Sequence, residues 1–341
     1  MYAGMSTWNG FIKYYQNMIK GHGDDSYRYD GIKSDFSSNI CKNPAACQAV
    51  TDHLAKMPEL LGHYPEPKAW SLERIIAQKH KISPTHVVVT SGATEAIYLT
   101  AQAFRLKPII PSPTFSEYKD ACNMFPTEDC SRSCLWLCNP NNPDGAVIKR
   151  EMVNEIIKNH DLIVIDQSYE NYTLWDVMSI KKAATCQNVV QIHSMTKTYG
   201  VPGLRLGYII TSSPLARQLH RYQRPWSVSS LAIEAGKFLL QHDELMCRPD
   251  FDEAFRVRCK LEKMEGVSVH QGYSTFMLCE LKKGTAAQLK DYLANEHHLL
   301  IRDASNFKKL TVRHFRIAIQ TPAENNVLLE AIQSYIKMTN G

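Results

Sequence analysis

Four apolar, strand-like runs in the sequence end in polar residues of the types that carry out catalysis. The runs alternate with helix-like stretches, a pattern typical of a mostly parallel sheet covered by helices on both faces. Ligands of such sheets bind beyond the carboxyl ends of the strands. The residues that follow HVVVT, CLWLC, LIVI and VVQI are, in order, Ser91-Gly92-Ala93-Thr94; Asn142; Asp166 and Tyr169; and Ser194 and Lys197.

These groups together offer an anion site, an amide, a carboxylate, a phenol and an amine. Each alone has an ordinary structural explanation as a turn, a helix cap, a core tyrosine or a surface lysine. Their joint occurrence on strand ends favours one site. Pyridoxal phosphate requires this set, because its aldehyde needs an amine, its ring nitrogen a carboxylate, its ring hydroxyl donors, and its phosphate a helix N-terminus.

The motifs resemble the class I/II, fold-type I pyridoxal-phosphate aminotransferase family over nearly the whole chain. They are S-x-T-K-x-x-G-x-P-G-L-R-x-G from Ser194, with NPNNPDG, DQSY and GATEA upstream. The resemblance implies pyridoxal 5'-phosphate as the cofactor and an α/β fold of a large, mostly parallel-sheet domain with a smaller α+β domain.

The resemblance also implies a role for each matching residue. Lys197 would be the Schiff-base lysine, and Asp166 would pair with the pyridine nitrogen. Asn142 and Tyr169 would hydrogen-bond to the ring hydroxyl. The residues expected around the phosphate are Gly92, Ala93, Thr94, Ser194 and Arg205, with Phe115 stacked on the ring and Tyr64 reaching the phosphate of a second subunit. We therefore expect a homodimer with a shared active site.

One residue departs from the family pattern inside these motifs. Asp144 stands where the family usually has threonine in NPxNPTG. Because the amide of Asn142 lies two residues earlier, we expect the cofactor contacts to be unaffected.

Arginines near the carboxyl end of the chain are candidates for substrate binding. Arg316 in HFRIAIQ matches the family's arginine that binds a substrate anion, and Arg302 in LLIRDASNF is a second candidate. A guanidinium suits carboxylate or phosphate through paired hydrogen bonds. His22 and Asn39, in GHGDDSY and DFSSNI, are further expected substrate contacts.

Two subfamilies share the core motifs. DFSSNI, RPWSVSSLA and IRDASNF resemble L-threonine-O-3-phosphate decarboxylases, which make the aminopropanol phosphate of the cobalamin side chain; HGD and CKNP depart from that subfamily's HGG and NPLG. We expect decarboxylation of L-threonine O-3-phosphate to (R)-1-amino-2-propanol O-2-phosphate. The alternative is an aminotransferase for histidinol phosphate or an aromatic amino acid, using 2-oxoglutarate or glutamate, because the residues do not show which bond at Cα is broken.

Length and pattern predict two domains. The 341 residues are too many for one ordinary compact core. The strand–helix alternation continues to residue 214 and then changes to shorter strands. We expect a large cofactor-binding domain over 41–214 and a small domain formed by 1–40, as an N-terminal arm, with 215–341.

Composition excludes several classes of protein. The net charge of +5 is mild and spread along the chain, so nucleic-acid binding is not expected. A pyridoxal-phosphate-binding regulator would need a DNA-binding module, and the opening of about forty residues is loop-rich. The ten cysteines form no CxxC pattern, and no metal site is expected. The sequence has neither a leader pattern nor a membrane-spanning run, so we expect a cytoplasmic protein.

Overall fold

The structure is a computed structural model that describes residues 25–340, except for the side chain of Asn340. The chain forms two compact units. The large unit comprises Ile40–Phe251 and Gln271–Thr275. The small unit comprises the described residues up to Asn39 together with Asp252–His270 and the stretch from Phe276 onward.

A mixed sheet forms the centre of the large unit. In the part of the chain that the structure describes, its six strands have the order β2 (Val87–Thr90), β7 (Gly207–Thr211), β6 (Val189–Ser194), β5 (Leu162–Asp166), β4 (Asp129–Cys138) and β3 (Leu106–Ile109). Strands β3 to β6 are parallel neighbours, while β7 runs antiparallel to β6 and to β2. The expected mostly parallel sheet is confirmed, and β7 is its antiparallel member.

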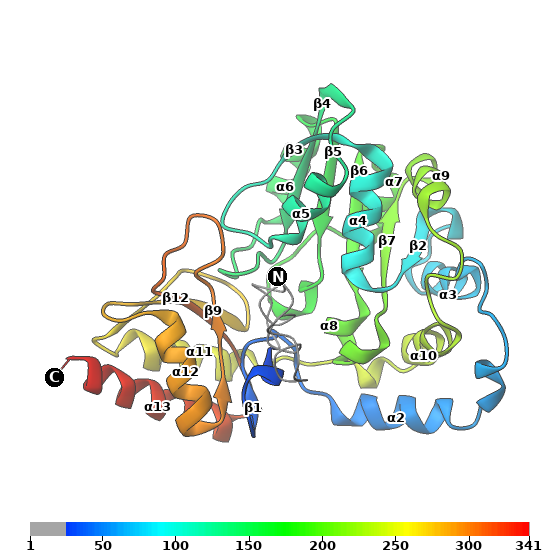
Figure 1. Ribbon diagram of the computed structural model, residues 1–341. Helices are drawn as coiled ribbons and strands as arrows, with labels where there is room; N and C mark the ends of the chain where they lie inside the picture. Colours follow the sequence, from blue (N-terminus) through cyan, green and yellow to red (C-terminus); the bar gives the residue numbers. More distant parts are fainter. Residues whose placement is uncertain (1–24, 341) are drawn as a thin grey trace, which may run out of the picture. The chain divides into compact units, whose positions relative to one another are not determined.

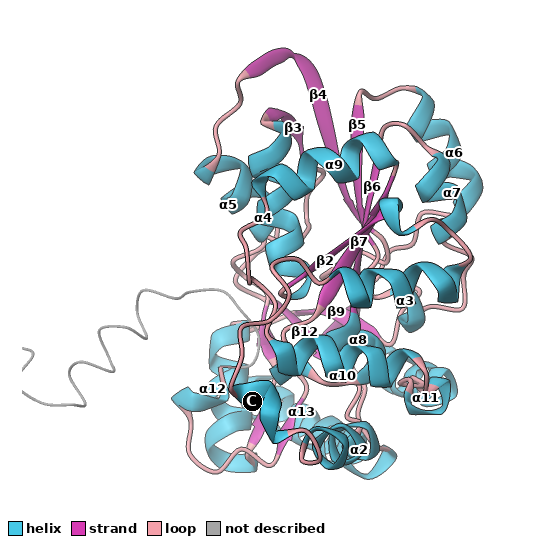
Figure 2. Cartoon of the chain, turned by 90° about the vertical axis from the view of Figure 1, so that its right-hand side faces the viewer, coloured by secondary structure: helices cyan, strands magenta, loops and turns pink. Residues whose placement is uncertain are grey.

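Helices cover this sheet on both faces. They are α3 (Trp70–His80), α4 (Gly92–Phe104), α5 (Glu117–Met124), α6 (Arg150–Lys158), α7 (Ile180–Thr185) and α9 (Ser213–Tyr222). Helix α10 (Ser230–Leu240) packs on α3, and α2 (Pro44–Leu54) packs on α10. Figure 2 shows the sheet nearly edge-on, with α4 and α5 on one face and α6 and α7 on the other. Every residue of β5 and β6 is therefore buried, as expected of central strands between two helical layers.

The segment that carries Lys197 is a short helix. Strand β6 ends at Ser194, and α8 (Met195–Tyr199) follows at once. Gly200 ends this helix in the left-handed conformation, with φ of 68°. A side chain there would place Cβ 2.5 Å from the carbonyl oxygen of Cys41, so the close approach requires glycine.

The small unit has its own sheet and core. Within the described residues its antiparallel sheet has the order β11 (Arg302–Asp303), β12 (His314–Ala318), β9 (Phe276–Leu281) and β8 (Val267–Val269), and β1 (Ser34–Asp35) pairs in parallel with β10 (Leu299–Leu300). Helices α11 (Phe251–Glu262), α12 (Ala286–His297) and α13 (Pro322–Asn340) pack on one face of this sheet (Figure 1).

Alternation along β12 separates the two faces of the small sheet. Phe315 and Ile317 lie in the core with the helices. His314 and Arg316 therefore lie on the opposite face, because successive side chains of a strand point to opposite sides. This face carries the arginine expected to bind substrate.

The division into units differs from the sequence-based boundary after residue 214. Helix α9 spans that boundary and α10 follows it, and both belong to the large unit. Helix α10 contributes Ala232, Ala235 and Leu239 to the core that also holds Leu72 and Ile76 of α3. The change of pattern at residue 214 marks the end of the sheet, whereas the compact unit extends through these helices to Phe251.

Among the described helices, none has both the length and the apolar content needed to cross a membrane. The longest, α13, carries charged residues such as Glu324, Glu330 and Lys337 along its length.

Leu239→Ala tests the assignment of α10 to the large unit. Leu239 is fully buried, so we expect the substitution to lower the free energy of unfolding by about 2–5 kcal/mol. Leu174, which is 77% exposed, provides the matched control, and Leu174→Ala should change it by less than about 0.5 kcal/mol. Urea denaturation followed by circular dichroism measures both. Equal, small effects would contradict the packing described for α10.

Candidate active site

Lys197 and Tyr169 lie together at the carboxyl end of β5 and β6. The Lys197 ammonium lies 5.6 Å from the centroid of the Tyr169 ring, within the range of a cation–π contact. Tyr169 packs edge-on against Tyr172, with the ring centroids 5.6 Å apart. The Tyr172 hydroxyl donates a hydrogen bond of 3.1 Å to the Lys197 carbonyl oxygen. The lysine is half-buried, so its amine is held among aromatic rings and not fully in solvent.

Asp166 is a buried carboxylate held by two donors. It is the last residue of β5 and only 4% exposed. The Tyr118 hydroxyl donates to its Oδ2 at 2.8 Å, and the Ser168 N–H donates to its Oδ1 at 2.9 Å. Burial, together with the charge of Asp166, raises the pKa of the Tyr118 phenol well above its usual value. The phenol therefore stays protonated and remains a donor to the carboxylate.

Tyr118 was not predicted from the sequence, although it connects two predicted residues. Its ring packs edge-on against Phe115, with centroids 5.8 Å apart, and stacks on Trp136 at 5.6 Å. Phe115 lies just before α5, whose N-cap is Ser116, and Tyr118 follows three residues later in the first turn of the helix. That spacing is the signal through which Tyr118 could have been found.

The NPNNPDG turn is anchored at the end of β5. The Asn139 N–H donates to the Asp166 carbonyl oxygen at 2.8 Å. Asn142, in the same turn, is buried, with a relative exposure of 5%. The Asp144 Oδ1 accepts from the Asn141 amide at 2.9 Å and from the Ala146 N–H at 3.0 Å. Asp144 thus stabilises its own turn, and its departure from the family pattern has a local structural role.

Gly92 and Arg205 form a cradle at the start of α4. Gly92 has φ of +81°, and a Cβ added there would lie 2.7 Å from Nη2 of Arg205. Gly207 also packs closely against the start of α4, because a Cβ added at Gly207 would lie 2.8 Å from the Ala93 nitrogen. Strand pairing places Gly207 opposite both Thr90 and Ser194. The first turn of α4, Ser194 and Arg205 are therefore brought to one place.

This cradle fits a phosphate group. The first N–H groups of a helix have no partner within the helix, and the helix dipole attracts anions to them. Within the described part of the chain the Ser91 side chain makes no capping hydrogen bond to α4. Thr94 and the Arg205 guanidinium are exposed beside this helix start. Backbone donors and an accessible arginine together provide what a phosphate requires.

Tyr64 lies on the surface of the large unit. Its side chain is 85% exposed, and its ring lies 5.4 Å from that of Trp226, itself 52% exposed. This exposure leaves the hydroxyl accessible to a second chain. The homodimer with a shared active site remains a prediction.

Two buried arginines face each other in the small unit. Arg302 of β11 pairs directly with Arg316 of β12, and their side chains are 5% and 3% exposed. The Arg316 Nη2 donates to the Ser37 carbonyl oxygen, and the Arg302 Nη2 donates to Oδ1 of Asn306 at 2.7 Å. Burial, followed by the charge of Arg316, lowers the pKa of Arg302 to about 10. A pair of desolvated like charges favours a bound anion.

Asn39 lies at the end of the same unit's first segment. It is fully buried, with φ of 51°, and neither atom of its side-chain amide has a hydrogen-bond partner among the described residues. A buried amide without partners is costly, and a polar ligand would satisfy it. His22, the other expected substrate contact, lies outside the described residues.

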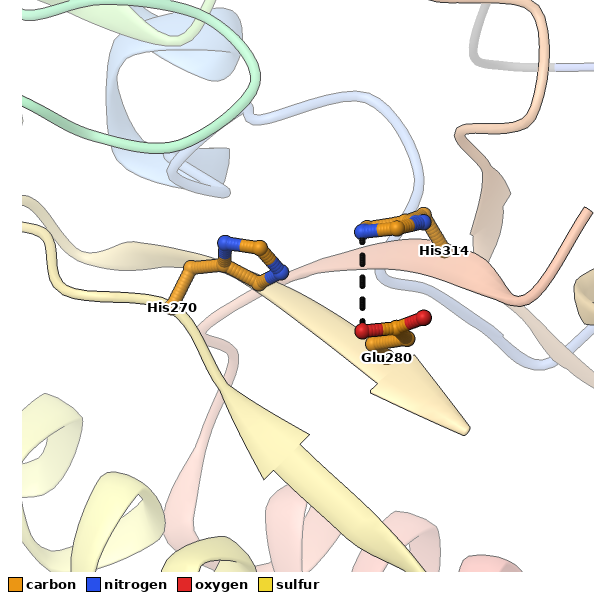
Figure 3. Close-up of side chains that lie close together, drawn as sticks. All are labelled: His270, Glu280 and His314. Carbon is orange, nitrogen blue, oxygen red and sulfur yellow. Dashed lines mark ion pairs between the residues drawn. The ribbon is translucent and has the colours of Figure 1, made fainter. Parts of the chain in front are cut away.

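Three further side chains of the small unit bring metal-ligand atoms together (Figure 3). The donor atoms of His270, Glu280 and His314 lie within 4.8 Å of one another. The Thr311 N–H donates to His314 Nδ1 at 3.0 Å, so the proton of the neutral ring is on Nε2, which lies 3.9 Å from the Glu280 carboxylate. Arg313 also binds Glu280, at 2.6 Å. We interpret the cluster as a polar network, because His314 and Glu280 have hydrogen-bond or ion-pair partners in the protein and the His270 ring packs against that of His314.

Comparison with known proteins identifies the family. The sequence pattern of Aminotransferase class I and II matches residues 32–128 and 125–332. The chain belongs to this family. It is a pyridoxal-phosphate-dependent enzyme of that family, whose members act on small amino compounds, some of them phosphorylated.

Within this family the chain is similar to decarboxylases. The crystal structure of L-threonine-O-3-phosphate decarboxylase from Porphyromonas gingivalis is 35% identical, with a TM-score of 0.84 over 89% of this chain and 99% of that one. A relative from Caldanaerobacter subterraneus subsp. tengcongensis, provisionally named a threonine-phosphate decarboxylase, is 31% identical over 92% of this chain and 93% of its own length. Histidinol-phosphate aminotransferase from Clostridium acetobutylicum, 24% identical with a TM-score of 0.77 over 89% of this chain and 99% of that one, shares the fold.

Gly92→Ala tests the cradle. The left-handed conformation would cost an alanine about 1–2 kcal/mol, and its Cβ would displace the Arg205 guanidinium. We expect a less stable protein that binds pyridoxal phosphate more weakly, measured by urea denaturation and by cofactor titration. Gly203→Ala is the control, because no described atom lies within 4 Å of its added Cβ. Unchanged cofactor affinity in Gly92→Ala would show that the phosphate binds elsewhere.

Proposed function

We propose that this chain decarboxylates L-threonine O-3-phosphate to (R)-1-amino-2-propanol O-2-phosphate with pyridoxal phosphate as its cofactor. The observation that carries the proposal is the buried arginine pair Arg302 and Arg316, which calls for an anionic ligand. L-Threonine O-3-phosphate brings two anionic groups, a phosphate and a carboxylate. The similarity to decarboxylases at 31% and 35% identity supports the same substrate class.

The large unit has the residues to hold the cofactor. Lys197 would bond its aldehyde carbon, and the first turn of α4 with Arg205 would bind its phosphate. Asp166, kept as an acceptor by Tyr118 and Ser168, would hold the proton on the ring nitrogen. When bound, pyridoxal phosphate supplies an electron sink for the carbanion left by loss of CO2.

The protein's own groups would decide which bond at Cα breaks. Pyridoxal phosphate would supply the electron sink, and Arg302 and Arg316 would act by binding and orienting the anionic groups of the substrate. Paired, charge-assisted hydrogen bonds from Arg302 and Arg316 give the orientation that a single lysine would not. Lys197 Nζ would be the group that returns a proton to Cα before the amine product leaves.

The runner-up is a histidinol-phosphate aminotransferase. It would use the same cofactor residues, and Lys197 would be the group that removes the Cα hydrogen. The fold shared with the Clostridium acetobutylicum enzyme fits both reactions. The two candidates differ in what they release and in whether a keto acid is needed.

The deciding experiment is incubation of the cofactor-loaded protein with L-threonine O-3-phosphate in the absence of any keto acid. We expect catalytic release of CO2, trapped and counted, with the amine phosphate as the other product. Lys197→Ala should lose this activity and, after borohydride reduction, should carry no covalently attached cofactor. Absence of CO2 from a protein that retains its yellow colour, with turnover of histidinol phosphate and 2-oxoglutarate, would replace the proposal with the aminotransferase.

Arg316→Leu tests the arginine pair. Loss of a buried, charge-assisted contact to a substrate anion costs at least about 2 kcal/mol, so we expect kcat/KM to fall by at least about 30-fold. Arg313, three residues earlier, pairs with Glu280 and is partly exposed, so Arg313→Leu is the matched control and should retain activity. Steady-state kinetics on L-threonine O-3-phosphate measures both. Similar kinetics in the two variants would remove Arg316 from substrate binding.

A further inference from the structure

Two cysteines far apart in the sequence meet beside the helix that carries Lys197. Cys41 and Cys247 are 206 residues apart, and the Cys247 thiol donates to the Cys41 carbonyl oxygen at 3.4 Å. Each thiol is also the largest influence on the pKa of the other, so the two side chains are neighbours. Both residues are free thiols that belong to the large unit.

Surrounding contacts hold the pair in place. The Asn43 side-chain amide donates to the Leu245 carbonyl oxygen at 2.7 Å and to the Cys247 sulfur at 3.8 Å. Gly200 packs directly on both cysteines, because an added Cβ there would lie 2.5 Å from the Cys41 oxygen and 3.1 Å from the Cys247 sulfur. The segments that carry the two thiols are thus fixed against the end of α8.

The same segments supply the hydrogen bonds that end α8. The Cys247 N–H donates to the Thr198 carbonyl oxygen at 2.8 Å. The Cys41 N–H donates to the Tyr172 hydroxyl at 3.1 Å, and that hydroxyl donates to the Lys197 carbonyl oxygen at 3.1 Å. The last carbonyl groups of a helix lack partners within the helix. Here two consecutive carbonyls, one of them that of Lys197, depend on the chain around the cysteines.

The environment of the two thiols shifts their pKa values in opposite directions. Cys41 is partly exposed, and the neighbouring Cys247 side chain lowers the pKa of its thiol to about 7. The same contact and burial raise the pKa of Cys247. By contrast, burial raises the pKa of Cys134, Cys138 and Cys279, which lie in the cores. The thiolate is the nucleophilic form, so an accessible thiolate next to a buried second thiol is the arrangement of a redox-active pair.

We propose that Cys41 and Cys247 form a reversible disulfide that perturbs the end of the lysine-bearing helix α8. The oxidant is a small disulfide such as oxidised glutathione. The Cys41 thiolate attacks one of its sulfurs, forming a mixed disulfide and releasing one glutathione thiolate. The Cys247 sulfur then attacks the Cys41 sulfur and releases the second glutathione, whose thiolate takes up the Cys247 proton. Two protein thiols lose two electrons, and the small disulfide gains them.

Closing the bond requires a local movement. The Cys247 sulfur, which now contacts the Cys41 carbonyl oxygen, must approach the Cys41 sulfur to a bond length of about 2.05 Å. Because the backbone groups of both residues contact α8 directly or through Tyr172, this movement is transmitted to the carbonyls of Lys197 and Thr198. The inference does not depend on which substrate the enzyme uses.

The test is oxidation of the full-length protein with oxidised glutathione, followed by alkylation and peptide mass mapping without reductant. We expect one linked peptide pair containing Cys41 and Cys247, lighter by two hydrogen atoms and restored by dithiothreitol. Cys247→Ser should instead retain glutathione on Cys41, and Cys41→Ser should form no adduct at Cys247. Cys130→Ser, which removes an exposed thiol of β4, should behave as the wild type.

Cys47 provides the alternative that could overturn the pairing. It is exposed, and its sulfur contacts the Gly200 carbonyl oxygen at 3.8 Å. A linked peptide pair that contains Cys47, or one that persists in Cys247→Ser, would contradict the assigned bond. Hydrogen–deuterium exchange of peptides covering α8 measures the second part of the proposal. Faster exchange on oxidation in the wild type but not in Cys247→Ser would support the link, and unchanged exchange in the linked protein would overturn it.

Discussion

A carboxylate buried at the end of a central strand needs hydrogen-bond donors around it, and Asp166 imposes this requirement on the large unit. Tyr118 supplies one donor from α5, and the Ser168 N–H supplies another from the turn after β5. The Asn139 N–H binds the carbonyl of the same aspartate, which fixes the NPNNPDG turn next to it. One buried charge therefore places a helix, a strand end and a turn around the position expected for the cofactor ring.

The cradle at the start of α4 forms because glycines allow neighbouring segments to pack closely there, and it does not depend on a buried charge. Gly92 and Gly207 lie where a side chain would collide with Arg205 or with the backbone of Ala93. The antiparallel strand β7, lying between β2 and β6, carries Gly207 to this position. Without that strand, Arg205 and Ser194 would not lie beside the same helix N-terminus, so the single antiparallel member of the sheet has a direct part in forming the cradle.

The small unit buries two positively charged arginines next to each other, an arrangement that lowers the stability of the fold. Burying Arg302 directly opposite Arg316 desolvates two cations, and the lowered pKa of Arg302 reports the cost. The fully buried amide of Asn39, without a partner among the described residues, adds an unsatisfied polar group to the same unit. An anionic substrate beside these groups would offset the two positive charges and give the Asn39 amide a hydrogen-bond partner.

The sequence by itself determined the strands, the turn motifs and the family, because these depend on local apolar runs and on short spacings such as Asp166 to Tyr169. It also predicted that Lys197, Tyr169 and Asp166 belong to one end of the sheet, as parallel strands require. Tertiary structure decided what depends on distant residues. Tyr118 becomes the donor to Asp166 only when α5 packs on the sheet, and α10 joins the large unit only through its contacts with α3. Cys41 and Cys247 meet across 206 residues because both segments pack on Gly200 at the end of α8, and no local pattern encodes such a contact.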